Sequence, residues 1–277
     1  MAAAKAVVFG YGDIGVRGLA ALLGAGLEVP LVVTHRDDPD ESRWYASLFD
    51  FSKSRHLHVL ADPPMETLDV GTPDLIFSFY YRSMLPMSLL KRARRGAYNM
   101  HGSLLPKFRG RAPLNWAILK GETETGVTLH EMVEKPDAGR IVDQQAVPIG
   151  LDETAVEVFR KLADAAEAVL RRSIPNLISG KANLRPQDLS AGSYYGRRTP
   201  EDGRIDWSKS AREIHNLVRA VAPPFPGAFT QGLRVLKTAR TEKTHSRNTL
   251  GPYREGDQWL AACGDGKVLR LLQVEPT

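Results

Sequence analysis

Short apolar runs alternate with helix-like segments along the first half of the chain, and this alternation constrains the fold more than any other feature. Strand-like runs are separated by helical patterns at residues 16–27 and 83–95, and the runs themselves cover 5–10, 28–35, 73–81 and 96–103. Strands that alternate with helices predict a parallel sheet covered on both faces. Right-handed crossovers then place the ligand crevice at the carboxyl ends of the strands. We therefore predict an α/β protein with a doubly wound parallel sheet.

The second half of the chain changes character after a long helix predicted at residues 152–179. Residues 183–203 are rich in Gly, Pro, Ser and charge, as is typical of a link between domains. Beyond them, Ser210 and Glu213 form a capping-box pattern before an apolar helix face, and short strands flank the turn 264–266. We predict two domains: a larger α/β domain at residues 1–190 and a small β-rich domain at residues 191–277.

Charge and cysteine content narrow the class of protein. The 277 residues carry 37 Lys and Arg against 32 Asp and Glu, a net charge of +5, which suits an anionic ligand as well as it suits a solvated basic surface. Cys263 is the only cysteine in the sequence, which excludes an internal disulfide and a cysteine-based metal cluster. No signal-peptide core or membrane-length apolar window occurs, so we expect a cytoplasmic protein that does not insert into membranes.

The stretch GYGDIG, at residues 10–15, matches the dinucleotide-binding fingerprint of a Rossmann-like sheet. An NAD site would place an acid about 20 positions later, at the end of the second strand. Thr34 and Arg36 stand there instead, a pair that would suit the extra phosphate of NADP. The pattern alone leaves two readings open: an NADP-dependent oxidoreductase, or a tight turn that merely requires glycine.

The residue types best suited to catalysis are concentrated in NMHGSLLP, at residues 99–106, and in the loop KPDAG, at residues 135–139. Asn99 and His101 are two residues apart at the end of a strand, so their side chains face the same way. An amide donor beside an imidazole can stabilise an oxyanion while the imidazole transfers a proton. Asp137 could fold back to orient His101 and raise its pKa. The alternative is that all three residues are structural.

The motifs NMHGSLLP, RGRAP and DAG resemble those of the 10-formyltetrahydrofolate-dependent formyltransferases. The resemblance extends over nearly the whole chain. It is strongest to the formyltransferase domain of the lipid A aminoarabinose pathway enzyme, through HGSLLPKFRGRAPLNWAILKGETETGVTLH and GRRTPEDG. It implies a Rossmann-like catalytic domain with a smaller C-terminal OB-like β-barrel domain. It also implies formyl transfer to the amine of a nucleotide-linked sugar, UDP-4-amino-4-deoxy-L-arabinose above others, without metal or NAD(P).

The resemblance also implies roles for individual residues. Asn99 would stabilise the oxyanion, His101 would transfer protons, and Asp137 would raise the pKa of His101. The 10-formyltetrahydrofolate donor would lie against Ser83, Met84, Leu85, Arg111, Val133, Glu134, Lys135, Pro136 and Asp137. The nucleotide sugar would contact Tyr11, Asp13, Ser103, Arg197, Arg198 and Thr199.

Methionyl-tRNA formyltransferase is the alternative from the same family. That family usually carries a long basic insertion after the second strand, whereas THRDDPDESRWYASLF, at residues 34–49, is compact and acidic. This difference argues against a nucleic-acid partner. The chain also has nothing that corresponds to the decarboxylase of the bifunctional enzyme. The sequence leaves open the sugar, the choice of uracil or thymine, the stereochemistry at the amine-bearing carbon, a separate decarboxylase partner and the oligomeric state.

Overall fold

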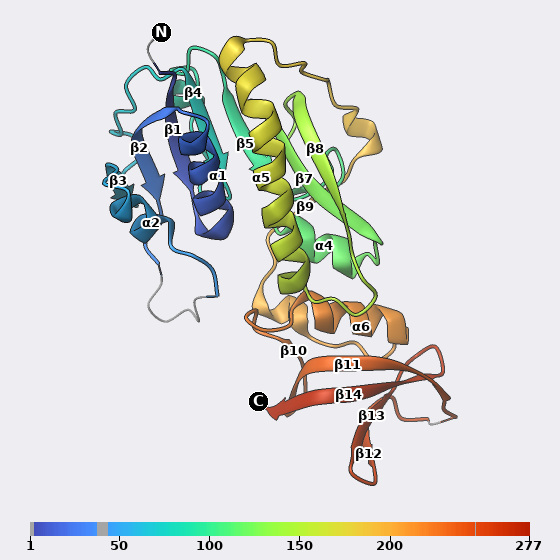
Figure 1. The fold of residues 1–277 in the computed structure, drawn as a ribbon. Helices are drawn as coiled ribbons and strands as arrows, with labels where there is room; N and C mark the ends of the chain where they lie inside the picture. Colours follow the sequence, from blue (N-terminus) through green and yellow to red (C-terminus); the bar gives the residue numbers. More distant parts are fainter. Residues whose placement is uncertain (1–2, 38–43, 247) are drawn as a thin grey trace. The chain divides into compact units, whose positions relative to one another are not determined.

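The structure is a computed structural model that describes residues 3–37, 44–246 and 248–277 (Figure 1). The chain divides into two compact units. The first comprises residues 1–110, 126–147 and 161–194, and the second comprises 111–125, 148–160 and 195–277. A single domain boundary after residue 190 stays a prediction.

A seven-stranded sheet forms the centre of the first unit, in the order β3-β2-β1-β4-β5-β7-β8. Its strands are β1 (Lys5–Gly10), β2 (Glu28–Thr34), β3 (Val59–Ala61), β4 (Leu75–Phe79), β5 (Ala97–His101), β7 (Glu124–Glu131) and β8 (Ile141–Pro148). The pairs from β3 to β5 are parallel, as predicted, and the order reverses direction at β1, which defines a doubly wound, Rossmann-like sheet. β7 pairs antiparallel with β5, so the sheet is mixed rather than wholly parallel.

The glycines of GYGDIG bring helix α1 (Gly12–Gly24) close to the sheet. A Cβ on Gly10 would lie 2.9 Å, and one on Gly15 would lie 3.0 Å, from Leu48 of α2 (Leu48–Ser54). Beyond the fingerprint, a Cβ on Gly18 would lie 2.4 Å from the ring of Phe79 in β4. Gly12 has φ +59°, a conformation that side chains disfavour. The fingerprint is therefore explained by packing and turn geometry.

Of two further helices, α3 is shorter than predicted and α5 forms where predicted. α3 (Met87–Leu90) is much shorter than the predicted 83–95, because the chain after Leu90 turns back and its amides bond to the start of β4: Arg95 N donates to Asp74 O. The long helix α5 (Ala155–Ser179) forms where expected, and its first turn is capped by Thr154 with Glu157. No helix in the described ranges is long and apolar enough to cross a membrane.

The second unit holds a five-stranded antiparallel sheet that forms the predicted OB-like half-barrel. Its order is β10-β11-β14-β13-β12, and its strands are β10 (Ala228–Thr230), β11 (Leu233–Thr244), β12 (Gly251–Glu255), β13 (Gln258–Ala262) and β14 (Lys267–Pro276). α4 (Pro113–Leu119) and α6 (Ala211–Ala220) belong to the same unit. The predicted capping box of α6 is present, with Ser210 Oγ accepting from Glu213 N at 3.2 Å.

The remaining elements are short. β6 (Arg109–Gly110) pairs with β9 (Tyr194–Tyr195), and the 3-10 turns η1 (Leu189–Ala191) and η2 (Pro200–Gly203) lie in the segment that follows α5. Arg109 N donates to Ser193 O at 3.0 Å, and Phe108 N donates to Ser193 Oγ at 2.9 Å. Residues after α5 therefore return to the segment that directly follows SLLP.

Candidate active site

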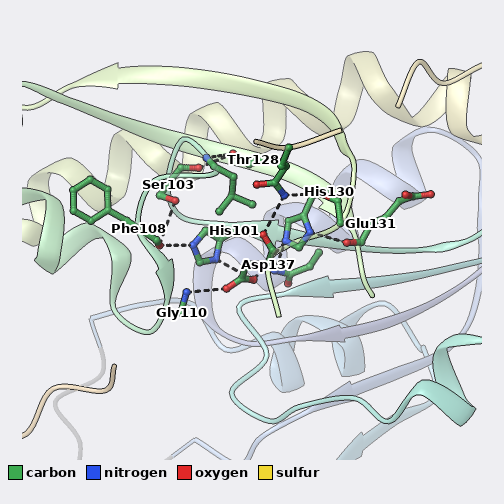
Figure 2. Close-up of polar contacts among 12 residues, drawn as sticks. His101, Ser103, Phe108, Gly110, Thr128, His130, Glu131 and Asp137 are labelled. Carbon is green, nitrogen blue, oxygen red and sulfur yellow. Dashed lines mark hydrogen bonds and ion pairs between the residues drawn. The ribbon is translucent and has the colours of Figure 1, made fainter. Parts of the chain in front are cut away.

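The carboxyl end of β5 carries the predicted residues Asn99 and His101. The His101 ring points toward the predicted residue Asp137 (Figure 2). Asn99 and His101 lie on one face of β5, as their spacing requires. The antiparallel register with β7 sets Asn99 opposite His130 and His101 opposite Thr128. Two of these side chains, His101 and His130, also face Asp137, whose Oδ1 lies 3.5 Å and 3.6 Å from their nearer ring nitrogens.

His101 is almost completely buried, and both of its ring nitrogens face oxygen atoms. Nε2 lies 2.9 Å from the carbonyl oxygen of Phe108, and Nδ1 lies 3.5 Å from Asp137 Oδ1. Because a carbonyl can only accept, Nε2 carries the hydrogen of the neutral ring, and Nδ1 is left with a lone pair that can accept a proton.

The pKa of His101 lies below its ordinary value, although Asp137 raises it as expected. Burial is the largest effect and lowers the pKa, whereas the charge of Asp137 and the Phe108 carbonyl raise it. The influence of Asp137 thus has the predicted direction, but burial outweighs it. The result is an imidazole held in its neutral, basic form.

Asp137 is held by Gly110 and by Gln187. Gly110 N donates to its Oδ2 at 2.9 Å, and Gln187 Nε2 donates to the Asp137 carbonyl at 3.1 Å and to the Gly139 carbonyl at 2.6 Å. The residue has φ +54°, in the left-handed region, so these bonds stabilise an unusual backbone conformation. Burial acts most strongly and raises the pKa of its carboxyl, but the charge of His101 and the hydrogen bond from the Gly110 amide help to bring it below the usual range.

His130 is a site residue that the sequence analysis misses. Its Nε2 lies 3.2 Å from Asn99 Nδ2 and 3.6 Å from Asp137 Oδ1, and its Nδ1 lies 2.7 Å from the carbonyl oxygen of Glu131. Figure 2 shows the His130 ring beside Asp137. The side chain is fully buried. The signal in the sequence is the two-residue spacing of Thr128 and His130, which repeats that of Asn99 and His101, but it has meaning only once β7 is known to pair with β5.

Thr128 fixes the turn that follows His101. Its hydroxyl donates to Ser103 O at 2.6 Å and accepts from Leu105 N at 3.0 Å and from Gln144 Nε2 at 2.9 Å. Ser103, predicted to contact the sugar substrate, is fully buried, and its hydroxyl donates to Lys107 O at 2.6 Å. The structure places Ser103 inside the turn, where its hydroxyl also lies 3.5 Å from Phe108 O, the carbonyl oxygen that accepts from His101.

A cavity of about 580 Å³ adjoins the loop that ends in Asp137. Apolar side chains of α3 and the chain after it form one wall, and the start of β5 and the segments on either side of Asp137 form the others. The lining residues are Met87, Leu90, Lys91, Ala93, Gly96, Ala97, Glu131, Met132, Val133, Ala138, Gly139 and Arg140. Apolar side chains and a few charged ones thus line the cavity, as is typical of sites for small organic ligands.

The residues predicted to hold the folate donor are placed unevenly around this cavity. Val133 lines it, whereas Leu85 packs into the hydrophobic core beneath it. Ser83 and Met84 precede α3 on the surface, and Met84 is 64% exposed. Glu134 and Lys135 are exposed and Pro136 is half-buried, in the loop between Val133 and Asp137.

Tyr11 and Asp13, predicted to contact the substrate, lie at the turn from β1 into α1 and already have protein partners. The Tyr11 hydroxyl is 2.6 Å from that of Tyr45, and Asp13 Oδ1 accepts from Ala46 N at 2.6 Å. The Arg82 guanidinium lies 4.2 Å above the Tyr11 ring.

Thr34 and Arg36, the pair that would suit the extra phosphate of NADP, lie at the end of β2 and just beyond it. His35 Nδ1 lies 2.7 Å from Asp62 Oδ1, and Arg36 N donates to Asp62 Oδ2 at 2.9 Å. Thr34 is buried. Among the described residues, no group of three or more His, Cys, Asp or Glu side chains is arranged to hold a metal ion.

Arg111, Arg197, Arg198 and Thr199 belong to the second unit. Arg111 and Arg197 are exposed, and Arg111 N donates to Tyr195 O at 2.9 Å. The Arg198 guanidinium lies 4.9 Å from the centre of the Trp116 ring and donates to Asp202 O at 2.9 Å. Thr199 caps η2 together with Asp202. The predicted ligand contacts of these four residues stay predictions.

Two models of formyl transferase domains match most of the chain. A family model described as formyl transferase matches residues 24–174, and one for the C-terminal domain of formyl transferases matches 197–277. An N-formyltransferase from Helicobacter canadensis, solved with folinic acid and dTDP-3-aminofucose, superposes with a TM-score of 0.81 at 22% identity, covering 99% of this chain and 100% of that one.

Two further solved structures share the fold. WlaRD, a sugar 3N-formyl transferase solved in the presence of dTDP and 5-N-formyl-THF, has a TM-score of 0.79 at 22% identity and covers 98% of each chain. A 4-N formyltransferase from Francisella tularensis has a TM-score of 0.65 at 21% identity, covering 80% of this chain and 90% of that one.

Proposed function

This chain belongs to the formyl transferase family, and we propose that it transfers a formyl group from 10-formyltetrahydrofolate to the amine of a nucleotide-linked amino sugar. The observation that carries the proposal is the convergence of Asn99, His101 and Asp137 beside the cavity at β5. The solved relatives that contain dTDP or dTDP-3-aminofucose support the class of acceptor. Following the sequence resemblance, the acceptor we propose is UDP-4-amino-4-deoxy-L-arabinose.

The proposed reaction is an acyl transfer between two nitrogens. The neutral sugar amine attacks the formyl carbon, the carbonyl electrons move to oxygen, and Asn99 donates a hydrogen bond to the resulting oxyanion. Nδ1 of His101 takes a proton from the amine and then gives it to the folate nitrogen as the carbon–nitrogen bond breaks. Asp137 stabilises the imidazolium that exists between these two steps.

The local geometry supports each of these roles. The low pKa of His101 keeps Nδ1 unprotonated before the amine arrives, as a general base requires. The hydrogen bond to Phe108 O orients the ring so that Nδ1 faces Asp137. The folate pteridine is proposed to occupy the 580 Å³ cavity, against Val133 and the backbone of the loop that ends in Asp137.

The acceptor can be tested directly. Purified protein is supplied with 10-formyltetrahydrofolate and, in separate reactions, UDP-amino sugar, dTDP-amino sugar or aminoacylated initiator tRNA. Mass spectrometry then detects the gain of one formyl group. We expect formylation of an amino sugar and not of the tRNA; formylation of the tRNA alone would refute the sugar assignment.

Methionyl-tRNA formyltransferase remains the second candidate function. The acidic segment that argues against it includes residues 38–43, which lie outside the described residues. Salt dependence separates the two candidates, since a tRNA acceptor contacts many phosphates and its binding weakens steeply as salt is added. A role in lipid A modification and a cytoplasmic location follow from the resemblance and composition, and we retain both as predictions.

A further inference from the structure

We infer that His130 is a positioning residue for the proposed reaction: its Nδ1–H tautomer fixes the orientation of the Asn99 amide. This inference rests on the proposed formyl transfer. Its basis is the pair of contacts that His130 makes, through Nδ1 to Glu131 O at 2.7 Å and through Nε2 to Asn99 Nδ2 at 3.2 Å.

The first contact determines the tautomer. The carbonyl oxygen of Glu131 has no hydrogen to give, so His130 Nδ1 must be the donor. In the neutral ring Nε2 then carries a lone pair and can only accept. The polar atom of Asn99 that faces Nε2 must therefore be its NH₂ group, and not its carbonyl oxygen.

The second contact determines what Asn99 offers to a substrate. One N–H is given to His130, which leaves the second N–H of the same group to donate to the formyl oxygen. An amide turned by half a rotation would present its carbonyl oxygen to Nε2, two acceptors in contact. It would also move the NH₂ group of Asn99 away from the place from which it is proposed to donate to the developing oxyanion. His130 thereby excludes the orientation of Asn99 that cannot stabilise negative charge.

The surroundings of His130 restrict it to this role. Its side chain is fully buried, and its ring lies edge-on to that of His101 with centroids 6.3 Å apart. The charged group nearest to Nε2 is Asp137, whose Oδ1 is 3.6 Å away. A hydrogen on Nε2 would point to that carboxylate, compete with His101 for it, and deprive Asn99 of its acceptor.

The tautomer can be measured without any assay of activity. Long-range ¹H–¹⁵N spectra of the wild-type protein distinguish a protonated from an unprotonated ring nitrogen for each of the seven histidines. We expect His130 to show a protonated Nδ1 and an unprotonated Nε2 at neutral pH. Protonation of Nε2 would overturn the inference, whatever the enzyme's substrate is.

A double-mutant cycle tests the link to Asn99. His130→Leu keeps the volume but removes the acceptor, and we expect kcat to fall roughly 10- to 100-fold while the dissociation constant for 5-formyltetrahydrofolate changes less than about threefold. In an Asn99→Ala background the same change should cost less than about twofold, because its target is gone. In an Asp137→Asn background it should keep its full cost.

The conservative variant His130→Gln, whose side-chain oxygen can accept from Asn99, should recover part of the lost kcat. An equal loss from His130→Leu with and without Asn99 would overturn the inference. So would a loss that disappears in the Asp137→Asn background, since His130 would then act through the carboxylate. If the wild-type protein transferred no formyl group to any amino sugar, that result would contradict the proposed function. The NMR test of the His130 tautomer would still apply.

Discussion

The charge of Asp137 can be removed with little change of shape by Asp137→Asn. The asparagine oxygen can still accept from Gly110 N, and the backbone bonds from Gln187 are unaffected. What is lost is the negative charge 3.5 Å from Nδ1 of His101, the atom proposed to take up the proton.

The expected loss follows from this distance. At an effective dielectric constant of about 20, two unit charges separated by the 3.5 Å between Asp137 Oδ1 and His101 Nδ1 attract by about 4 to 5 kcal/mol. If roughly half of the charge on the imidazole has developed in the transition state, about 2 to 3 kcal/mol is lost and kcat falls roughly 30- to 200-fold.

The pH dependence gives a sharper test than the rate. Activity requires neutral His101, so kcat rises with pH through the pKa of that imidazole. The Asp137 charge raises this pKa and burial lowers it, so removing the charge must lower it further. The acidic limb of the kcat profile should therefore move to lower pH in Asp137→Asn.

An acidic limb that stays in place or moves to higher pH, with a loss of kcat below about fivefold, would refute this reasoning. The matched control is the same substitution in a His101→Ala background, where the charge has no imidazole to stabilise and its removal should cost little.

Three further predictions concern the surroundings of the site. Gln187→Ala should lower kcat about 3- to 30-fold with a small change in melting temperature, because the half-buried Gln187 holds the Asp137 and Gly139 carbonyls rather than the core. Gly139→Ala should destabilise the protein by about 1 to 3 kcal/mol in urea unfolding, because the added Cβ would lie 2.0 Å from Glu131 O. The Cys263 thiol, whose pKa burial raises to about 12, should resist thiol reagents at mildly alkaline pH until denaturant is added.

Each of these has a contradicting result. Full activity in Gln187→Ala would show that the loop keeps its conformation unaided, and unchanged stability in Gly139→Ala would show that the loop can move away from β7. Rapid modification of native Cys263 would mean that the thiol reaches solvent. Gly180→Ala is the control for a glycine substitution, since a Cβ there meets no atom within 4 Å although its φ of +69° disfavours a side chain.

The sequence was sufficient for those parts of the fold that depend on local pattern. Alternating runs predicted the doubly wound sheet, and the spacing of Asn99 and His101 placed both side chains on one face of β5. The capping box at Ser210 and the turn at 264–266 also formed where expected. In each case the residues that form the structure are neighbours in the chain.

The features that the sequence analysis missed or predicted wrongly depend on contacts between residues far apart in the chain. β7 is absent from the strands predicted above, and without its antiparallel register nothing connects His130 to Asn99. The direction of the pKa shift of His101 depends on burial by segments that its own strand does not reveal. α3 is short because amides after Leu90 bond to the start of β4.

The return of the chain after α5 limits how these enzymes can be recombined. Gln187 holds the Asp137 loop, and Ser193 bonds to the backbone of Phe108 and Arg109, although both lie beyond the end of the long helix. A chimera that exchanges the C-terminal part to change the acceptor should therefore be joined after Tyr194. A junction immediately after α5 would replace the hydrogen-bonding groups that hold the Asp137 loop. The hybrid would then lose turnover even where the part exchanged to bind a new substrate folds correctly.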